Sequence, residues 1–363
     1  MVITKKNQFA PDYAIHPGEI LEETLAARSI SKSDLAARSG ISLKHISQII
    51  HGKAPITPET AISLERILDV KATLWLKLDS DYQLFFLKQR EEKTLEAKYT
   101  WAQKFPIKDL VKRGYLPQTD NKAVMVASLL DFFNVGTLDA CEIQYDTMAV
   151  KFRRTGNYKQ NGESVAAWLK IGENLAKNIS TKVFNKTAFE HALEKIRSLT
   201  KEAPDIFEPE MKRLCAESGV AVVFVREFPG TGISGATYWI GKDKALLMLS
   251  LRYKSDDHFW FTFFHEAGHI MLHGKGALIV DTHILSGNKM EKEANRFAAD
   301  FLIPLKEYEQ LILANLRIEE STIRQFASRI GIAPGIIVRR LQKEGRFKYS
   351  WHNGLKRRFE LKD

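Results

Sequence analysis

The spacing of apolar residues changes twice along the chain. From residue 16 to about residue 84, apolar residues recur every three or four positions in short groups separated by Gly or Pro, which predicts several short helices that pack together. After Gly219, two apolar runs of strand length, VAVVFVREF and KALLMLSLR, enclose a third short strand around Thr237 to Ile240. From residue 255 helical spacing returns. We therefore expect an α+β fold, mainly α, with a small antiparallel sheet.

Within the first group, residues 32–53 have the form of a helix-turn-helix. KSDLAARSG is followed by ISLKHISQIIHGK, in which Ala36 lets two helices cross closely, Gly40 permits the turn and Ile46 plugs between the helices. A serine can cap the second helix, and its exposed side chains suit a DNA major groove. The residues expected to contact DNA are Ser42, Leu43, Lys44, Ser47 and Gln48. A small helical bundle used for protein contacts is the alternative.

The net charge of +10 is unevenly distributed. Residues 1–80 hold ten Lys and Arg against nine Asp and Glu, which does not favour tight DNA binding by a monomer. Residues 321–363 hold eleven against three, and STIRQFASRIGIAPGIIVRRLQKEG repeats the spacing of the first helix-turn-helix. This basic region is either a second helix-turn-helix-like hairpin whose arginines and lysines contact phosphates, or a helical cap with a solvated basic face.

Other features of the sequence bear on the localisation of the protein, on its cysteines and on its helical middle. No apolar run approaches the 18 residues of a membrane span, and the first residues lack a secretory signal, so we expect a cytoplasmic protein without membrane contacts. Cys141 and Cys215 form no CxxC pair, so neither a disulfide framework nor a thiolate zinc site is indicated. In the helical middle, Trp168 could belong to a ligand-sensing element, but a packed core is favoured.

The stretch HFWFTFFHEAGHIMLHG, residues 258–274, carries the strongest chemical signal. On a helix, His265 and His269 project from one face about one turn apart, close enough to share a Zn²⁺ ion. Glu266 lies beside them and can act as the general base and acid of a peptide hydrolysis. His273 is rotated about 80 degrees from His265 and is not expected to bind the metal; it can cap its helix instead.

A catalytic zinc needs a third protein ligand, and MEKEANRFAADFLIP, residues 290–304, offers two glutamates. Glu291 shares a helix face with small alanines that would let this helix approach the first one closely, and Asn295 on that face could orient a histidine. Glu293 is the rival ligand. For the oxyanion of the reaction, Tyr238 and His283 are available, although neither is singled out by the pattern.

Two stretches resemble known families. Residues 16 to about 84, with the HPGEIL opening and the TLWLKLDSDYQL ending, resemble the HigA-type antitoxins of the Cro/CI repressor superfamily. That resemblance implies a homodimer that represses its own operon and neutralises a toxin. Residues 206–305, with HEAGHIMLH and EKEANRFAADFLIP, resemble the ImmA/IrrE zinc metallopeptidases, which implies His265, His269 and Glu291 as ligands and a partner repressor as substrate.

These observations predict four regions and one function. The regions are a helix-turn-helix DNA-binding domain (1–84), a helical middle region (85–205), a metallopeptidase domain (206–305) and a basic helical C-terminal region (306–363). The predicted function is a DNA-binding regulator that recognises a double-stranded operator and carries a zinc-dependent endopeptidase acting on a specific protein partner or on itself. The alternative is an antitoxin and autorepressor whose metallopeptidase fold only binds a partner or ligand.

Overall fold

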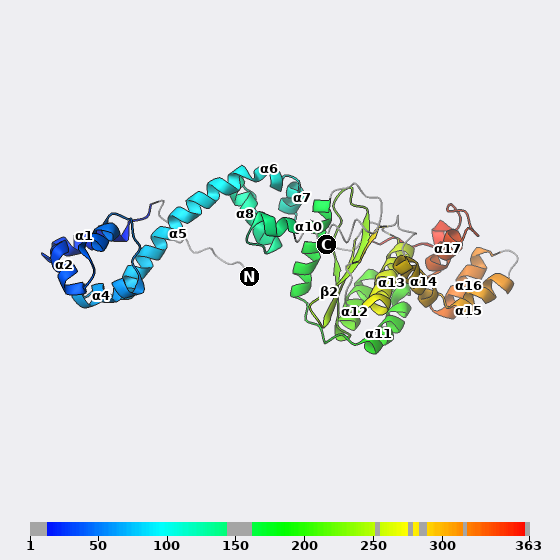
Figure 1. The fold of residues 1–363 in the computed structure, drawn as a ribbon. Helices are drawn as coiled ribbons and strands as arrows, with labels where there is room; N and C mark the ends of the chain where they lie inside the picture. Colours follow the sequence, from blue (N-terminus) through cyan, green and yellow to red (C-terminus); the bar gives the residue numbers. More distant parts are fainter. Residues whose placement is uncertain are drawn as a thin grey trace. The chain divides into compact units, whose positions relative to one another are not determined.

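The computed structural model describes residues 13–143, 162–250, 255–274, 289–314 and 318–359, and the backbone of 279–282. The chain divides into two compact units, which are described separately (Figure 1). One unit contains Met1–Tyr99 and Thr119–Val126, and the other contains Thr100–Gln118 and Ala127–Asp363.

The first unit is built from helices around one small core. Ser31 forms a capping box with Asp34, Gly40 ends the following helix at φ 72°, and Ser42 caps the next one, so the helix-turn-helix prediction is confirmed. The buried side chains include Leu21, Leu35, Ile46, Leu64 and Trp75. The helices are α1 (Pro17–Ala27), α2 (Lys32–Ser39), α3 (Leu43–Ile50), α4 (Pro58–Leu68) and α5 (Ala72–Ala97).

The HPG sequence before α1 has a steric explanation. The Nδ1 atom of His16 accepts a hydrogen bond from the backbone N–H of Gly18 at 2.9 Å. A Cβ atom on Gly18 would lie 2.5 Å from the carbonyl oxygens of both Ile49 and Ile50. Only glycine therefore lets the start of α1 rest on the end of α3, which fixes the orientation of α3 within this unit.

The predicted helical middle is confirmed over its described part. Its helices are α6 (Tyr99–Ala102), α7 (Ile107–Lys112), α8 (Lys122–Phe133), α10 (Gly162–Lys177), α11 (Lys186–Ser198) and, overlapping its end, α12 (Pro204–Glu217). Trp168 is fully buried, and its indole N–H donates to the carbonyl oxygen of Val225 at 2.8 Å. The packed-core interpretation of Trp168 is thus the correct one. Cys141 and Cys215 are buried free thiols.

The sheet is mixed, so the prediction of an antiparallel sheet was wrong in part. Its strands are β1 (Val220–Phe224), β2 (Ile233–Ile240), β3 (Lys244–Leu249) and β4 (Ile279–Thr282), in the order β1-β3-β2-β4. β2 pairs antiparallel with both β3 and β4, whereas β1 pairs with β3 in parallel. The reason is the connection after β1, which carries the chain past β3 to β2, so that β3 returns beside β1 in the same direction.

Both faces of the sheet are covered, which explains its continuously apolar strands. Val222 and Leu247 belong to the core that also contains the aromatic residues of the following helix. On the opposite face Met248 lies against Gly172 of α10, where an added Cβ would come within 2.1 Å of its methyl carbon. α10 of the middle region therefore covers the face of the sheet opposite α13.

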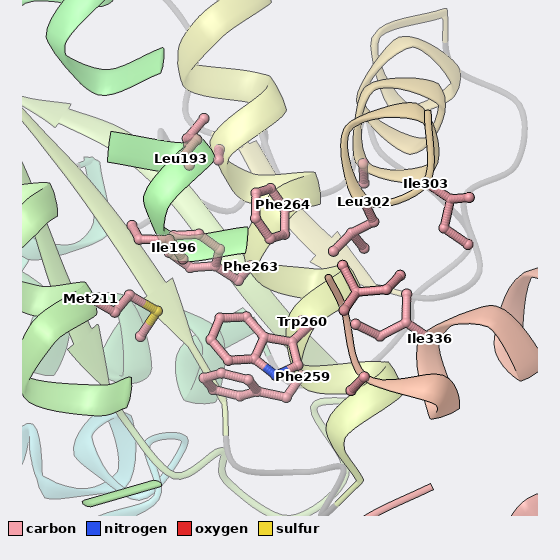
Figure 2. Close-up of a cluster of buried hydrophobic side chains, with 14 of the residues drawn as sticks. Leu193, Ile196, Met211, Phe259, Trp260, Phe263, Phe264, Leu302, Ile303 and Ile336 are labelled. Atoms are coloured by element: carbon pink, nitrogen blue, oxygen red, sulfur yellow. The ribbon is translucent and has the colours of Figure 1, made fainter. Parts of the chain in front are cut away.

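The C-terminal helices pack on the sheet through α13 (Asp256–His273). The remaining helices are α14 (Lys289–Leu302), α15 (Leu305–Ala314), α16 (Glu320–Ile330) and α17 (Pro334–Lys343). Figure 2 shows the aromatic side chains of α13 among residues from α11, α12, α14 and α17, with Phe259, Trp260, Phe263 and Phe264 at the centre. The aromatic half of the 258–274 stretch thus anchors α13 in the largest core.

The start of α13 is held by a segment about 100 residues further along the chain. Asp256 and Asp257 are fully buried; Arg357 pairs with the first at 3.2 Å and Lys356 with the second at 2.8 Å. Burial raises the pKa of Asp256 to about 6 even beside Arg357. Arg357 also donates to the carbonyl oxygen of Lys201 at 2.6 Å. This segment therefore connects α13 to the middle helices.

The basic C-terminal region forms a cap on this core. Six of the ten residues of α17 are buried, among them Ile336, Ile337 and Val338, so most of this helix packs on the core. Arg339 stacks on Phe261, and Arg340 donates to the carbonyl oxygens at the end of α14. These contacts support the helical-cap interpretation over the second DNA-binding hairpin.

No helix in the described ranges is both long enough and apolar enough to cross a bilayer.

Arg340 offers a direct test of the cap. Its side chain is 10% exposed and donates to Ala299 at 2.8 Å and Ile303 at 2.7 Å. We expect Arg340→Gln to lower the free energy of unfolding by about 2–3 kcal/mol, because two partly buried carbonyl groups lose a charged donor. Arg324→Gln removes only an exposed pair with Glu320 and should cost less than about 0.5 kcal/mol. Urea denaturation measures both, and equal losses would contradict the cap.

Candidate metal centre

Two histidines of α13 meet at one point of the buried interior. His265 is 2% exposed and His269 is 1% exposed. Their Nε2 atoms are 3.0 Å apart, as expected for side chains one helical turn apart on the same face. Since the aromatic residues before them are anchored in the core, both imidazoles are held in place by packing.

α14 brings a carboxylate to the same point because it lies unusually close to α13. A Cβ atom on Gly268 would lie 3.0 Å from the ring of Phe297 and 3.3 Å from the Cα atom of Ala294. The two helices thus approach across Gly268 and the small residues of α14, as the sequence pattern predicted. Glu291, in the first turn of α14, places Oε2 3.2 Å from Nε2 of His265 and Oε1 3.5 Å from Nε2 of His269.

The three side chains fit a tetrahedral metal ion. Ligand atoms held about 2.0–2.1 Å from one tetrahedral centre lie about 3.3 Å from each other. The two Nε2 atoms are 3.0 Å apart, and each lies 3.2–3.5 Å from one of the two carboxylate oxygens of Glu291. Oε1 of Glu291 is buried and accepts no hydrogen bond from the part of the chain that is described. Two imidazoles and one carboxylate are a donor set typical of Zn²⁺.

The environment favours the protonation states that a metal requires. Burial lowers the pKa of His269, against the opposing effect of Glu291. Burial works to raise the pKa of Glu291, but the close contacts and opposite charges of His265 and His269 outweigh it and hold that pKa at about 2. The carboxylate is therefore ionised at neutral pH, and burial promotes the neutral form of His269, which can donate a lone pair.

Glu266 lies beside this group and faces the sheet. Its side chain is fully buried, and Thr237 of β2 donates a hydrogen bond from Oγ1 to its Oε2 atom at 2.7 Å. A Cβ atom on Gly235, two residues earlier in β2, would lie 2.5 Å from Oε1 of Glu266. β2 therefore gives this carboxylate both a hydrogen-bond donor and the space that it occupies. Neither Gly235 nor Thr237 was identified from the sequence.

Glu293 occupies a different position from Glu291. It is 43% exposed, and its Oε2 atom lies 3.1 Å from Nε2 of His273, away from the group of three. The geometry thus places Glu291, and not its rival, with the two histidines. Asn295 is exposed on α14, so the expected contact with a histidine is not seen. His273 instead lies next to His269, with their Nδ1 atoms 2.8 Å apart.

Tyr238 has a structural contact. Its hydroxyl group donates to the carbonyl oxygen of Leu169 on α10 at 3.3 Å, on the face of the sheet opposite α13. His283 lies outside the described residues.

The residues expected to contact DNA all lie on α3 or at its start. Leu43 is 48% exposed and Lys44 is exposed, while Ser47 and Gln48 are half-buried. The hydroxyl oxygen of Ser42 accepts a hydrogen bond from the backbone N–H of His45 at 3.2 Å, which is its role as helix cap. The face opposite these residues is closed by the buried Ile46, Ile49 and Ile50.

Comparison with known families agrees with both parts of the chain. Residues 21–75 match the family described as Helix-turn-helix, and residues 215–342 match the family described as IrrE N-terminal-like domain, a peptidase family. The Virulence-associated protein I of Dichelobacter nodosus is 36% identical over 80 residues, which cover 22% of this chain and 74% of that protein. The chain belongs to the helix-turn-helix family and carries an IrrE-type domain.

Two further relatives match the N-terminal part. The uncharacterized HTH-type transcriptional regulator YddM of Escherichia coli K12 is 32% identical over 68 residues, which cover 19% of this chain and 72% of that protein. The antitoxin HigA of Pseudomonas aeruginosa, whose structure was solved with the higBA promoter, is 33% identical to this chain. The match covers 24% of this chain and 95% of the HigA chain, with a TM-score of 0.23.

The IrrE-type match contains every element of the candidate metal centre. It spans β2, α13 and α14 and continues through the helical cap to residue 342. The chain is thus a DNA-binding helix-turn-helix regulator with a peptidase-family domain.

Gly235 should be the most restrictive position of β2. We expect Gly235→Ala to push the Glu266 side chain away and to lower the free energy of unfolding by about 1–3 kcal/mol, because an added methyl group overlaps buried atoms. Gly354→Ala is the matched control, since no atom lies within 4 Å of its added Cβ. Chemical denaturation compares the two variants, and an equal, small effect would show that the Glu266 carboxylate is not confined by β2.

Proposed function

We propose that this protein is a regulator whose IrrE-type domain is a zinc-dependent endopeptidase, which hydrolyses a peptide bond in a specific protein partner, either a repressor or the chain itself. The observation that carries the proposal is the buried group of His265, His269 and Glu291 with Glu266 beside it. A structural zinc site has no need of an adjacent carboxylate that is not one of its ligands.

His265, His269 and Glu291 would hold the ion. Bound there with one open position, Zn²⁺ would polarise the peptide carbonyl group and increase the acidity of water. Glu266 takes the proton of the attacking water and transfers it to the leaving amine. Thr237 keeps one oxygen of this carboxylate fixed, and the other lies against Gly235 of the same strand. Burial of all four side chains excludes bulk water from the proton transfer.

The sheet offers a place for an extended substrate. In the described ranges β4 pairs with β2 alone, through residues 279–282. Its other edge can form main-chain hydrogen bonds with a peptide strand, as in other cases of strand addition. β2 and β4 are neighbours, and β2 carries Thr237 beside Glu266, so a strand added at this edge lies on the side of the sheet nearest the site.

The DNA-binding unit is proposed to recognise an operator as a homodimer through α3. Support comes from the exposure of Leu43 and Lys44 beside the half-buried Ser47 and Gln48. The near balance of charge in residues 1–80 is consistent with a dimer, since two copies double the number of phosphate contacts. The proposed domain limits remain 1–84, 85–205, 206–305 and 306–363, and the proposed partners are operator DNA and a substrate or toxin protein.

Glu266→Gln tests the catalytic proposal. Glutamine keeps the shape and the acceptor for Thr237 but cannot take a proton, so we expect cleavage to fall by about 10²–10⁴-fold while stoichiometric zinc binding is retained. Glu194→Gln changes an exposed glutamate of α11 and should leave cleavage unchanged. The assay incubates each zinc-loaded protein with the product of the neighbouring gene and follows fragments by mass spectrometry. Equal activity of the wild type and Glu266→Gln would favour the non-catalytic alternative.

Gln48→Ala tests the DNA-contact proposal. We expect a loss of about 1–3 kcal/mol in binding to the DNA upstream of the gene, confined to one base pair of each half-site, because glutamine pairs with a base edge. Gln89→Ala changes an exposed glutamine of α5 and should have no effect. Fluorescence anisotropy at one fixed salt concentration measures both. If the two variants bind alike, Gln48 does not read the operator.

A further inference from the structure

His273 lies behind one of the proposed metal ligands and connects it to α14. Its side chain is 6% exposed, and its Nδ1 atom lies 2.8 Å from Nδ1 of His269. Its Nε2 atom lies 3.1 Å from Oε2 of Glu293. The Nε2 atom of His269 points the other way, toward His265 and Glu291. Three side chains thus form one line of polar contacts that leads from the site to the surface.

The position of each ring proton in this line follows from the role of Nε2 of His269. If Nε2 of His269 donates its lone pair to a metal, the proton of that neutral ring must be on Nδ1. Nδ1 of His273 must then accept it, because two N–H groups cannot face each other at 2.8 Å. The proton of His273 is consequently on Nε2, where it donates to the carboxylate of Glu293.

The geometry points to His273 and Glu293 as positioning residues that fix the orientation and the tautomer of His269. The inference rests on the proposed metal site. A histidine that binds a metal usually donates its second N–H to a carboxylate or carbonyl group, and losing that partner weakens the metal site. Here the imidazole of His273 accepts the second N–H of His269, and the carboxylate of Glu293 accepts in turn from His273. α14 therefore contributes both Glu291 to the site and Glu293 to its support.

Measurements of zinc affinity distinguish a positioning role of His273 from two other possibilities: that it is a metal ligand, and that it has no effect on the metal site. We expect His273→Leu to weaken zinc binding about 10–100-fold, because His269 loses its acceptor. His273→Asn should restore most of the affinity, since its amide oxygen can replace Nδ1 as the acceptor. Glu293→Gln should weaken binding by less than about tenfold, because an amide oxygen still accepts from His273. His191→Leu, an exposed histidine of α11, is the matched control and should bind zinc like the wild type.

The affinities are measured by competition with a zinc chelator, on the full-length protein. Wild-type affinity for His273→Leu would overturn the inference, and so would a loss as complete as that of His265→Ala, which would make His273 a ligand. Thermal unfolding of the metal-free variants checks that each one folds; if His273→Leu does not fold, the protonation of His269 and His273 in the zinc-loaded wild type decides. A wild-type protein that binds no zinc would overturn the metal proposal itself, which is a different result.

Nitrogen NMR provides a second readout that does not depend on activity. Two-bond ¹H–¹⁵N correlation spectra of the zinc-loaded protein should show His269 protonated on Nδ1 and His273 protonated on Nε2. Glu293→Gln should leave the His269 assignment unchanged and alter the His273 resonances. A spectrum in which His273 carries its proton on Nδ1 would overturn the inference.

Discussion

The close packing of α14 on α13 is the contact on which the candidate site depends. A methyl group on Gly268 would lie only 3.0 Å from the ring of Phe297 and 3.3 Å from the Cα atom of Ala294, so glycine allows the two helices to approach this closely. That separation allows Glu291 to reach both histidines. The other end of α14 is fixed as well, because Arg197 and Arg340 donate to the carbonyl oxygens of Leu302 and Ile303. Cations at a helix C-terminus also interact favourably with the helix dipole. α14 is therefore held in its middle and at its C-terminal end, which limits the movement of the carboxylate.

Much of the site could be predicted from the sequence because it is encoded by spacing within helices. His265, Glu266 and His269 lie within five residues, and the small residues of α14 indicate which of its faces packs closely. The contributions of β2 could not be predicted in the same way. Thr237 and Gly235 approach Glu266 only because β2 lies between β3 and β4 in the sheet, and strand order is a tertiary property. The parallel pairing of β1 was missed for the same reason. The position of His273, four residues after His269, was visible in the sequence, but its role depends on Glu293 from another helix.

The structure also changes the interpretation of the charge distribution. The excess of Lys and Arg in residues 321–363 suggested a surface for phosphates, yet several of these side chains end on buried acceptors within the same unit. Arg340 and Arg357 donate hydrogen bonds to the carbonyl oxygens of Ile303 and Lys201, which join the C-terminal region to other elements of this unit. Net charge describes how a protein interacts over long distances, whereas the partners of individual guanidinium groups are decided by local packing.

The ion pairs at the start of α13 affect when the two units can form during synthesis. The core formed by α1 to α5 is built from contacts close together in the sequence, so it can fold soon after α5 leaves the ribosome. α13 starts with two buried aspartates whose partners, Lys356 and Arg357, are translated about 100 residues later. Until then the aspartates lack their counter-charges, and α13 lacks the layer formed by α17. A nascent chain thus acquires its DNA-binding unit well before it completes the candidate peptidase site.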